Sequence, residues 1–478
     1  MIEARDFSAA YVGGEWIGGA KTFAVTNPAT GQVLTEVADL APRDIEDAVD
    51  AAVAALPGWA AKTSHERAVI LHKWAALMME NQEALAQLMT AEQGKPLTES
   101  RGEVAYGVSF IDWFAEEAKR AYGEVIPPVL GNKRYMTIRQ PAGVAAAITP
   151  WNFPIAMLAR KVGAALAVGC TMVAKPAEET PLCALAMVKL ATDAGVPAGV
   201  FNVVTTSDAA AAGKVLCEHP KVRVLSFTGS TEVGKILYRQ CAGTMKKLAL
   251  ELGGNAPVLV FDDADLDRAV AASMASKYRN AGQTCVCANR IYVQAGVYDA
   301  FLERFVAATK TLKVGPGAEA GVEVGPLINA DAMAKVERLV ADATAKGAKV
   351  EIGGGPDPRG GQFYEPTVLS AVTADMQIAR EEIFGPVAPI VRFETEEEGV
   401  RLANDASVGL AAYIFTRDLS RSIRVSEALE TGIVGINDGV PAVAAAPFGG
   451  VKESGLGREG GRQGLEEYMD TKYICIGL

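Results

Sequence analysis

The stretch VAAAITPWNFPIAMLARKVGAALAVGCTMVAK, residues 144–175, contains a strand, a helix and a second strand in succession. Val144 to Ile148 and Thr171 to Lys175 are short apolar runs with the length of buried strands. The apolar segment that follows Pro154 is long enough to form the helix between them. Such strand–helix–strand units form parallel pairs with right-handed crossovers. The stretch therefore predicts an open, parallel α/β sheet.

The same alternation continues beyond this stretch. Further strands are expected at Val200 to Val204 and Val222 to Phe227. Helices are expected at Pro181 to Ala194, Ala209 to Cys217 and Thr231 to Cys241. Ligands of such sheets bind at the carboxyl ends of the strands, so residues that follow the strands are the first candidates for a site.

The region before Met136 has a different pattern, which is mainly helical. Apolar residues recur at three- and four-residue steps in Ile45 to Ala55, Ser64 to Glu80 and Gln82 to Glu92. A second α/β stretch begins near Gly254. The chain is therefore expected to contain more than one structural unit.

Two strand-like segments, Arg134 to Arg139 and Lys472 to Ile476, stand apart from both units. Their period suits pairing at a sheet edge, either inside one chain or between subunits. A plain surface hairpin explains them equally well.

Composition limits the classes of function. The 478 residues fit two or three domains, and a net charge of −11 argues against a nucleic-acid partner. No apolar run has the length of a membrane span, and the first residues lack the pattern of a signal peptide. Seven scattered cysteines and three histidines without ligand spacing predict neither a disulfide framework nor a metal site. We expect a cytoplasmic protein without a membrane partner.

A nucleophile and a base are suggested by Cys285 and Glu251, which lie on separate segments. Covalent acyl chemistry needs such a pair. A free thiol has a pKa of about 8.5, so a neighbouring base or charge must raise its thiolate fraction. Burial as small core residues is the alternative for Cys285 and Cys287. The polar run Asn280 to Thr284 is a poor core environment and favours the nucleophile.

A dinucleotide site is indicated by the turn from Phe227 to Gly234, although the spacing G-x-G-x-x-G is missing. Gly229 allows a phosphate to approach the backbone, and Ser230 adds a hydroxyl donor. Lys175 can reach ribose hydroxyls, and Glu178 can accept from a 2′-hydroxyl while repelling a 2′-phosphate. NAD is therefore the expected cofactor and NADP the weaker alternative. A solvated acid at a helix start is the other explanation of Glu178.

Seven motifs, taken in order over nearly the whole chain, resemble the aldehyde dehydrogenase family. They are Thr149 to Pro154, Lys175 to Glu178, Phe227 to Ser230, Glu251 to Gly254, Gly282 to Cys285, Glu381 to Pro386 and Pro447 to Lys452. Each motif is short, but the ordered set is specific. Asn280 to Cys287 and Ser454 to Gly460 most resemble the branch that oxidises succinate semialdehyde.

The resemblance implies an α/β fold with three parts. These are an open Rossmann-type cofactor domain (1–121 and 142–253), an α/β catalytic domain (254–446) and a small β oligomerisation arm (122–141 and 460–478). Members of the family commonly form homodimers or homotetramers. The resemblance thus favours pairing of Arg134 to Arg139 between subunits.

The resemblance also implies catalytic roles. Cys285 would attack the aldehyde carbon, and Asn152 with the backbone N–H of Cys285 would stabilise the oxyanion. A hydride would leave for the nicotinamide, and Glu251 would activate water to hydrolyse the thioester. A CoA-acylating dehydrogenase typically lacks a base at Glu251. If the chain were a cofactor-binding relative without activity, substitutions would be expected at Cys285, Asn152 or Glu251. All three residues are intact.

Further binding residues follow from the same resemblance. Glu382 would hold the nicotinamide ribose, Phe384 would pack beside the ring, and Trp151 would be a further cofactor-binding residue. Arg160 and Arg279 resemble carboxylate-binding arginines, which suit an anionic substrate.

The expected substrate is thus an aldehyde with a distal acid group, first of all succinate semialdehyde. Ala442 stands where this branch usually has a serine, so glutarate semialdehyde, sulfolactaldehyde and neutral aldehydes remain alternatives. Cys287 is a candidate redox partner of Cys285, and packing behind the nucleophile is an equally good explanation.

Overall fold

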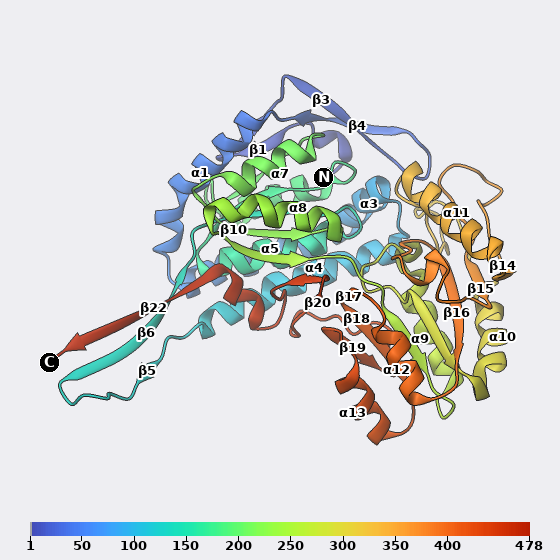
Figure 1. Cartoon of the computed structure of the whole chain (residues 1–478). Coiled ribbons are helices and arrows are strands. Elements are labelled where there is room, and N and C mark those ends of the chain that lie inside the picture. Colours follow the sequence, from blue (N-terminus) through green and yellow to red (C-terminus); the bar gives the residue numbers. More distant parts are fainter. Residues whose placement is uncertain (1) are drawn as a thin grey trace.

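An eight-stranded sheet lies at the centre of one half of the computed structural model, which describes residues 2–478. Its place in the molecule can be followed in Figure 1. Its strand order is β2-β1-β9-β8-β7-β10-β11-β21. The strands are β1 (Ala10–Val12), β2 (Glu15–Ile17), β7 (Val144–Ile148), β8 (Thr171–Lys175), β9 (Phe201–Val203), β10 (Val222–Thr228), β11 (Lys247–Glu251) and β21 (Gly455–Leu456). Strands β7 to β11 pair in parallel, as the strand–helix alternation predicts.

Helices cover both faces of this sheet. They are α1 (Pro42–Ala60), α2 (Ser64–Glu80), α3 (Gln82–Gln93), α4 (Leu97–Glu117), α5 (Pro154–Val168), α6 (Pro181–Ala194), α7 (Ala209–Glu218) and α8 (Thr231–Cys241). Successive side chains of a strand point to opposite faces. Accordingly, Ala145 and Ala147 of β7 pack with α4, α5 and α6, whereas Val144 and Ala146 pack with α1 and α7.

Helices α1 to α4 confirm the mainly helical pattern predicted before Met136, but the segment before α1 forms strands. Besides β1 and β2, it forms the hairpin β3 (Lys21–Thr26) and β4 (Val33–Asp39). In β3 only Phe23 and Val25 face inward, and an apolar alternation of two residues is too short to indicate a strand. The prediction for this region was therefore incomplete.

The order of the strands creates a binding crevice at one point of the sheet. From β7 the chain moves outward through β8 and β9, and it then returns to β10 on the other side of β7. Loops that leave adjacent parallel strands in opposite directions open a crevice at their carboxyl ends. The loops after β7 and β10 carry Trp151–Asn152 and Gly229–Ser230, respectively.

A seven-stranded sheet forms the other half of the molecule, in the order β14-β15-β16-β13-β12-β18-β19. The strands are β12 (Pro257–Val260), β13 (Arg290–Gln294), β14 (Lys349–Ile352), β15 (Thr367–Ser370), β16 (Val387–Phe393), β18 (Ala411–Phe415) and β19 (Ile433–Ile436). Its helices are α9 (Leu266–Tyr278), α10 (Tyr298–Thr309), α11 (Ala330–Ala345), α12 (Glu396–Asn404) and α13 (Leu419–Ala428). The short strands β17 (Val408–Gly409) and β20 (Val451–Lys452) pair beside it.

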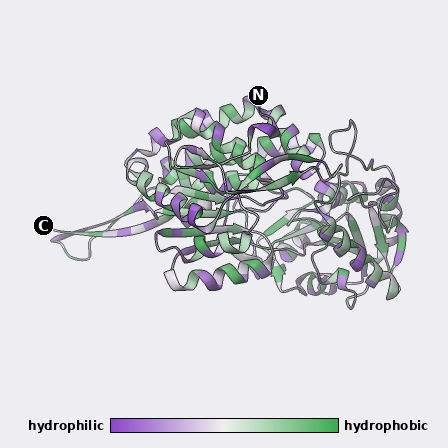
Figure 2. Ribbon diagram, turned by 90° about the horizontal axis from the view of Figure 1, so that it is seen from above, coloured by the Kyte–Doolittle hydropathy of each residue, from purple (hydrophilic) through white to green (hydrophobic). Residues whose placement is uncertain are grey.

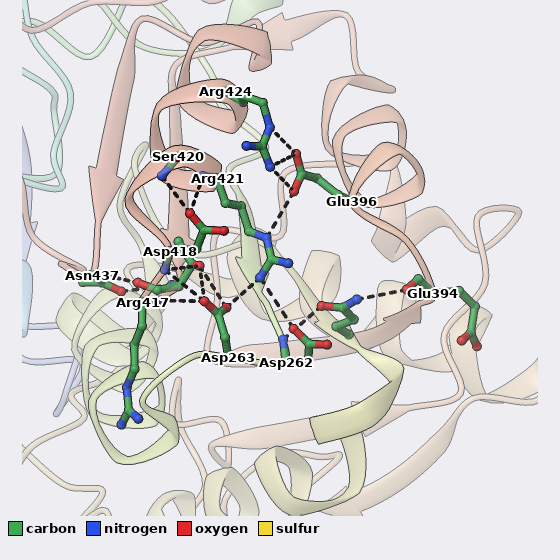
Figure 3. A network of polar contacts seen from close by, with 12 residues as sticks. Asp262, Asp263, Glu394, Glu396, Arg417, Asp418, Ser420, Arg421, Arg424 and Asn437 are labelled. Carbon is green, nitrogen blue, oxygen red and sulfur yellow. Dashed lines mark hydrogen bonds and ion pairs between the residues drawn. The ribbon is translucent and has the colours of Figure 1, made fainter.

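A polar network joins α12 and α13 to the end of β12 (Figure 3). The Asp263 carboxylate accepts hydrogen bonds from the backbone N–H of Arg417 and Asp418 and from Arg421, at 2.7 to 3.0 Å. Arg421 also donates to Glu396 of α12 at 3.1 Å. The half-buried guanidinium of Arg421 thus connects three segments at the rim of the second sheet.

A narrow arm leaves the body, and the C-terminus lies at its tip (Figures 1 and 2). It consists of β5 (Val125–Ile126), β6 (Lys133–Pro141) and β22 (Met469–Gly477), with β6 in the middle. β22 pairs with β6 along its whole length. The expectation that Arg134 to Arg139 pair between subunits needs correction, because these residues pair with β22 of the same chain. No helix within residues 2–478 combines the length and the apolarity of a membrane span.

Candidate active site

The thiol-bearing residue Cys285 lines two separate cavities. The first cavity has a volume of about 360 Å³ and includes Trp151, Asn152, Gly229, Ser230, Glu382 and Phe384 in its wall. The second cavity has a volume of about 310 Å³ and includes Tyr106, Arg160, Arg279, Ala442 and Phe448. Both volumes suit a small molecule. One thiol is thus accessible to two ligands that enter from different sides.

The backbone before Cys285 is held in an unusual conformation. Asn280, Ala281 and Gly282 have φ angles of 50°, 54° and 76°, a run of left-handed residues. A Cβ atom at Gly282 would lie 2.1 Å from the carbonyl oxygen of Gly385, so only glycine fits there. Non-glycine residues in this region store strain, which is found most often at functional sites.

Burial keeps the Cys285 thiol protonated. It raises the pKa of this thiol to about 12, and the nearby positive charge of Arg160 opposes the shift. Glu251 adds to the increase in pKa. A thiolate at neutral pH therefore needs additional positive charge or removal of the proton by a base.

Glu251 ends β11 and is 3% exposed. Within residues 2–478, neither of its carboxylate oxygens has a hydrogen-bond partner. Burial and, to a smaller extent, the charge of Glu459 raise the pKa of Glu251 to about 8, and the charge of Arg160 opposes this increase. A carboxyl group with a pKa near the working pH can both accept and release a proton. The environment of Glu251 thus suits a general base.

Asn152 follows β7 and is 4% exposed. Its side-chain Nδ2 donates to the carbonyl oxygen of Gln283 at 3.0 Å. Its Oδ1 has no partner within the described residues. A second hydrogen on Nδ2 is left for another acceptor, since an amide group has two donors. Asn152 lines the first cavity together with Cys285.

The first cavity contains five of the seven residues predicted to bind a dinucleotide. Gly229 and Ser230 lie at the start of α8, where a helix N-terminus attracts a phosphate. Glu382 accepts from the backbone N–H of Gly254 at 3.1 Å. The rings of Trp151 and Phe384 meet edge to face at 5.6 Å. These groups fit the nicotinamide and phosphate portion of such a cofactor.

Lys175 and Glu178, the other two predicted residues, do not line either cavity. They form an ion pair of 2.7 Å at the carboxyl end of β8. The Glu178 side chain is 39% exposed and is therefore open to a ligand. The adjacent β7 carries the loop to Trp151, so the pair lies next to the crevice.

The two arginines of the second cavity differ in their partners. Arg160 is buried in α5, forms an ion pair with Glu459 and lies 4.4 Å from the centre of the Phe448 ring. Arg279 has no carboxylate partner within 4.0 Å among residues 2–478, and its Nε has no hydrogen-bond acceptor. Arg279 is thus the cation that remains available to an anionic ligand.

Sequence reasoning missed a buried carboxylate, Glu459, that connects the two halves of the site. Glu459 pairs with both Arg160 and Lys161, and Lys161 also donates to Thr228 at 2.7 Å. Glu459 lies in the Ser454 to Gly460 motif, so the only signal in the sequence was the resemblance itself. Its partners are almost 300 positions away, and no local pattern reveals such a pairing.

Cys287 is buried beside the nucleophile segment. It is 5% exposed, and its thiol donates to the carbonyl oxygen of Lys277 at 3.5 Å. Both Cys285 and Cys287 are free thiols in this structure. No group of three or more potential metal-ligating side chains occurs within residues 2–478.

Comparisons with known proteins agree over almost the full length. The model described as "Aldehyde dehydrogenase family" matches residues 16–474. The chain is 57% identical over 471 residues to the Escherichia coli K12 succinate-semialdehyde dehydrogenase (NADP(+)), covering 98% of both chains. It is 56% identical over 483 residues to the 3-sulfolactaldehyde dehydrogenase of Pseudomonas putida, covering 100% of this chain and 99% of that one. A crystal structure of an E. coli NADP-dependent enzyme, 57% identical, has a TM-score of 0.98 and covers 99% of this chain and 98% of that chain.

Proposed function

Because this chain belongs to the aldehyde dehydrogenase family, we propose that it oxidises an aldehyde with a distal acid group to a carboxylic acid, with NAD as the hydride acceptor. The observation that carries the proposal is the position of Cys285 between a cavity that fits a dinucleotide and a cavity with an unpaired arginine. The direct test is NADH absorbance after the protein is mixed with NAD and succinate semialdehyde, with and without CoA. Product formation that depends on CoA would instead support acyl transfer to CoA.

The covalent step belongs to Cys285. Its Sγ forms a bond to the aldehyde carbon, and the carbonyl oxygen becomes an oxyanion. Asn152 Nδ2 and the backbone N–H of Cys285 are the proposed donors to that oxygen. Arg160, through its charge, favours the thiolate that attacks.

The second half of the reaction belongs to Glu251. When bound, NAD supplies an acceptor for the hydride that leaves the substrate carbon, and a thioester remains on Cys285. Glu251 accepts a proton from water, whose oxygen attacks the thioester carbon. The carbon–sulfur bond then breaks, which releases the acid and restores the cysteine. The carboxylate has no hydrogen-bond partner within the described residues, so its lone pairs are available to water.

The proposed cofactor site uses the first cavity and the end of β8. Glu382 would hold the nicotinamide ribose, with Trp151 and Phe384 beside the ring, and Gly229 and Ser230 would hold a phosphate. Lys175 and Glu178 would bind the adenosine ribose. The exposed Glu178 carboxylate supports a preference for NAD, because it would repel a 2′-phosphate.

The proposed specificity for acidic aldehydes rests on Arg279. An anion that enters a protein of net charge −11 needs local positive charge, and Arg279 is the unpaired cation of the second cavity. The names of the two relatives refer to different acidic aldehydes. Similarity to them therefore does not distinguish succinate semialdehyde from sulfolactaldehyde as the substrate. Succinate semialdehyde is the first candidate, and glutarate semialdehyde and sulfolactaldehyde are the alternatives.

Arg279→Leu is expected to raise KM for succinate semialdehyde about tenfold or more and to change KM for hexanal little. The loss follows from a charge-assisted hydrogen bond of about 1.5 to 3 kcal/mol. The matched comparison is Arg160→Leu, which removes an arginine of the same cavity but also leaves Glu459 with one partner fewer. Because Glu459 already pairs with Arg160, this variant is expected to raise KM for succinate semialdehyde less than Arg279→Leu does and to lower kcat for both aldehydes. Equal losses for both aldehydes in Arg279→Leu would show that Arg279 is structural.

Glu178→Ser is expected to raise kcat/KM with NADP relative to NAD. The substitution removes the charge that faces a 2′-phosphate and leaves Lys175 free to pair with that phosphate. The measurement is kcat/KM with each cofactor at saturating aldehyde. Equal use of NAD and NADP by the unmodified protein would refute the role of Glu178.

Four further expectations remain proposals. We infer the division into a cofactor domain (1–121 and 142–253), a catalytic domain (254–446) and an arm (122–141 and 460–478). The arm exposes Val125, Val129 and Tyr473, which supports its use in a homodimer or homotetramer. A cytoplasmic location agrees with the seven unpaired cysteines. A disulfide between Cys285 and Cys287 stays a prediction that rests on their spacing.

A further inference from the structure

A buried ammonium group lies directly behind the loop that carries Asn152. Lys95, which lies between α3 and α4, is 1% exposed. Its Nζ donates to the Glu103 carboxylate at 2.5 Å and to the backbone carbonyl oxygen of Asn152 at 2.6 Å. The same Nζ lies 3.8 Å from the centre of the Phe153 ring. All the contacts of this ammonium thus lie on α4 or on the loop after β7.

The partner carboxylate holds the other end of that loop. The Oε1 atom of Glu103 accepts from the backbone N–H of Ile155 at 2.9 Å and of Ala156 at 3.2 Å. These N–H groups belong to the first turn of α5, where a negative charge is favourable. Lys95 therefore holds the loop before Pro154, and Glu103 holds the first turn of α5 after it.

The Asn152 backbone is fixed through its carbonyl oxygen. Besides Lys95, Nδ2 of Asn280 donates to this oxygen at 3.0 Å. The side-chain Nδ2 of Asn152 is in turn held by the carbonyl oxygen of Gln283 at 3.0 Å. A fixed backbone and one fixed side-chain contact leave the second hydrogen of this amide with a defined direction.

We propose that Lys95 is a positioning residue, which with Glu103 orients Asn152 as the oxyanion donor. The inference rests on the proposed function, in which Asn152 stabilises the thiohemiacetal oxyanion. Oxyanion stabilisation requires donors that are already in place when the charge develops, because reorientation during the reaction costs free energy. Lys95 itself is not suited to bind the substrate anion, since Glu103 neutralises it and it does not line the second cavity.

The test is a double-mutant cycle between this ion pair and Asn152. Lys95→Met alone would leave a buried carboxylate unpaired and could unfold the chain, so the main variant is Lys95→Met/Glu103→Gln. The glutamine keeps an oxygen acceptor for the first turn of α5. The matched control is Lys214→Met/Glu218→Gln, which removes an exposed lysine–glutamate pair of 2.7 Å on α7. Far-UV circular dichroism and Tm establish that each variant is folded.

The expected result concerns kcat and the rate of the NADH burst. Lys95→Met/Glu103→Gln should lower both at least tenfold, with less than a threefold change in KM for the aldehyde and in Kd for NAD. In an Asn152→Ala background the same double substitution should cost less than threefold, because the residue that it positions is absent. The control should leave all values unchanged.

Other outcomes would overturn the inference. An equal loss in the presence and absence of Asn152 would assign the pair a general structural role. A change in KM confined to acidic aldehydes would instead give the pair a role in substrate binding through Glu103, which lines the second cavity. The proposed function is tested separately, since it fails if the unmodified protein does not oxidise acidic aldehydes or if Asn152→Ala is fully active.

Discussion

Cys285→Ala is expected to lower aldehyde oxidation by about 10⁴-fold or more, the scale of loss when a covalent nucleophile is removed. The reason is that, in the proposed mechanism, Sγ of Cys285 forms the bond to the substrate carbon, and no other thiol within residues 2–478 lines both cavities. Binding of NAD should change little, because the cavity keeps Trp151, Ser230 and Glu382. The measurements are steady-state NADH formation and NAD binding by titration calorimetry.

Cys287→Ala is the matched control for this substitution. Cys287 lies two positions away, is buried and lines neither cavity. The control variant should keep most of the turnover. A protein that loses activity with Cys287→Ala and keeps it with Cys285→Ala would reverse the assignment of the nucleophile.

Glu251→Gln is expected to slow turnover about 10²- to 10⁴-fold, the usual contribution of a general base. The first turnover should still produce NADH, because the base is needed only to hydrolyse the thioester. A burst of NADH followed by slow release of acid is therefore expected. Stopped-flow absorbance measures the burst, and mass spectrometry of the intact protein detects the acyl group on Cys285.

The pH dependence of the unmodified protein should reflect the same group. The pKa of Glu251 is raised to about 8, so below pH 8 most of this carboxyl is protonated and cannot accept a proton. The rate of thioester hydrolysis should therefore rise as the pH increases through about 8. Glu251→Gln should abolish this rise. A uniform loss of rate without a burst would indicate that Glu251 acts earlier, for example on the thiol of Cys285.

Some predictions from the sequence are corrected or refined by the structure. Arg134 to Arg139 were identified as a strand, but their partner is β22 of the same chain. Arg160 and Arg279 look equivalent in the sequence, yet a carboxylate neutralises the first and no carboxylate pairs with the second within the described residues. In each case the sequence pattern does not show the deciding contact, because the partner residue lies far away along the chain.

The sequence by itself determined the parallel sheet around β7 and β8 and the order of the chemical groups along the chain. These features are local, because the period of a strand or helix and the residue types of a motif are contained in a few successive positions. Only the tertiary structure placed Lys95 and Glu103 behind Asn152 and Glu459 beside Arg160. It also decided the pKa of Glu251, because burial and neighbouring charges set that value. Such effects depend on which distant segments come into contact when the chain folds. A pattern of neighbouring residues in the sequence does not show these contacts.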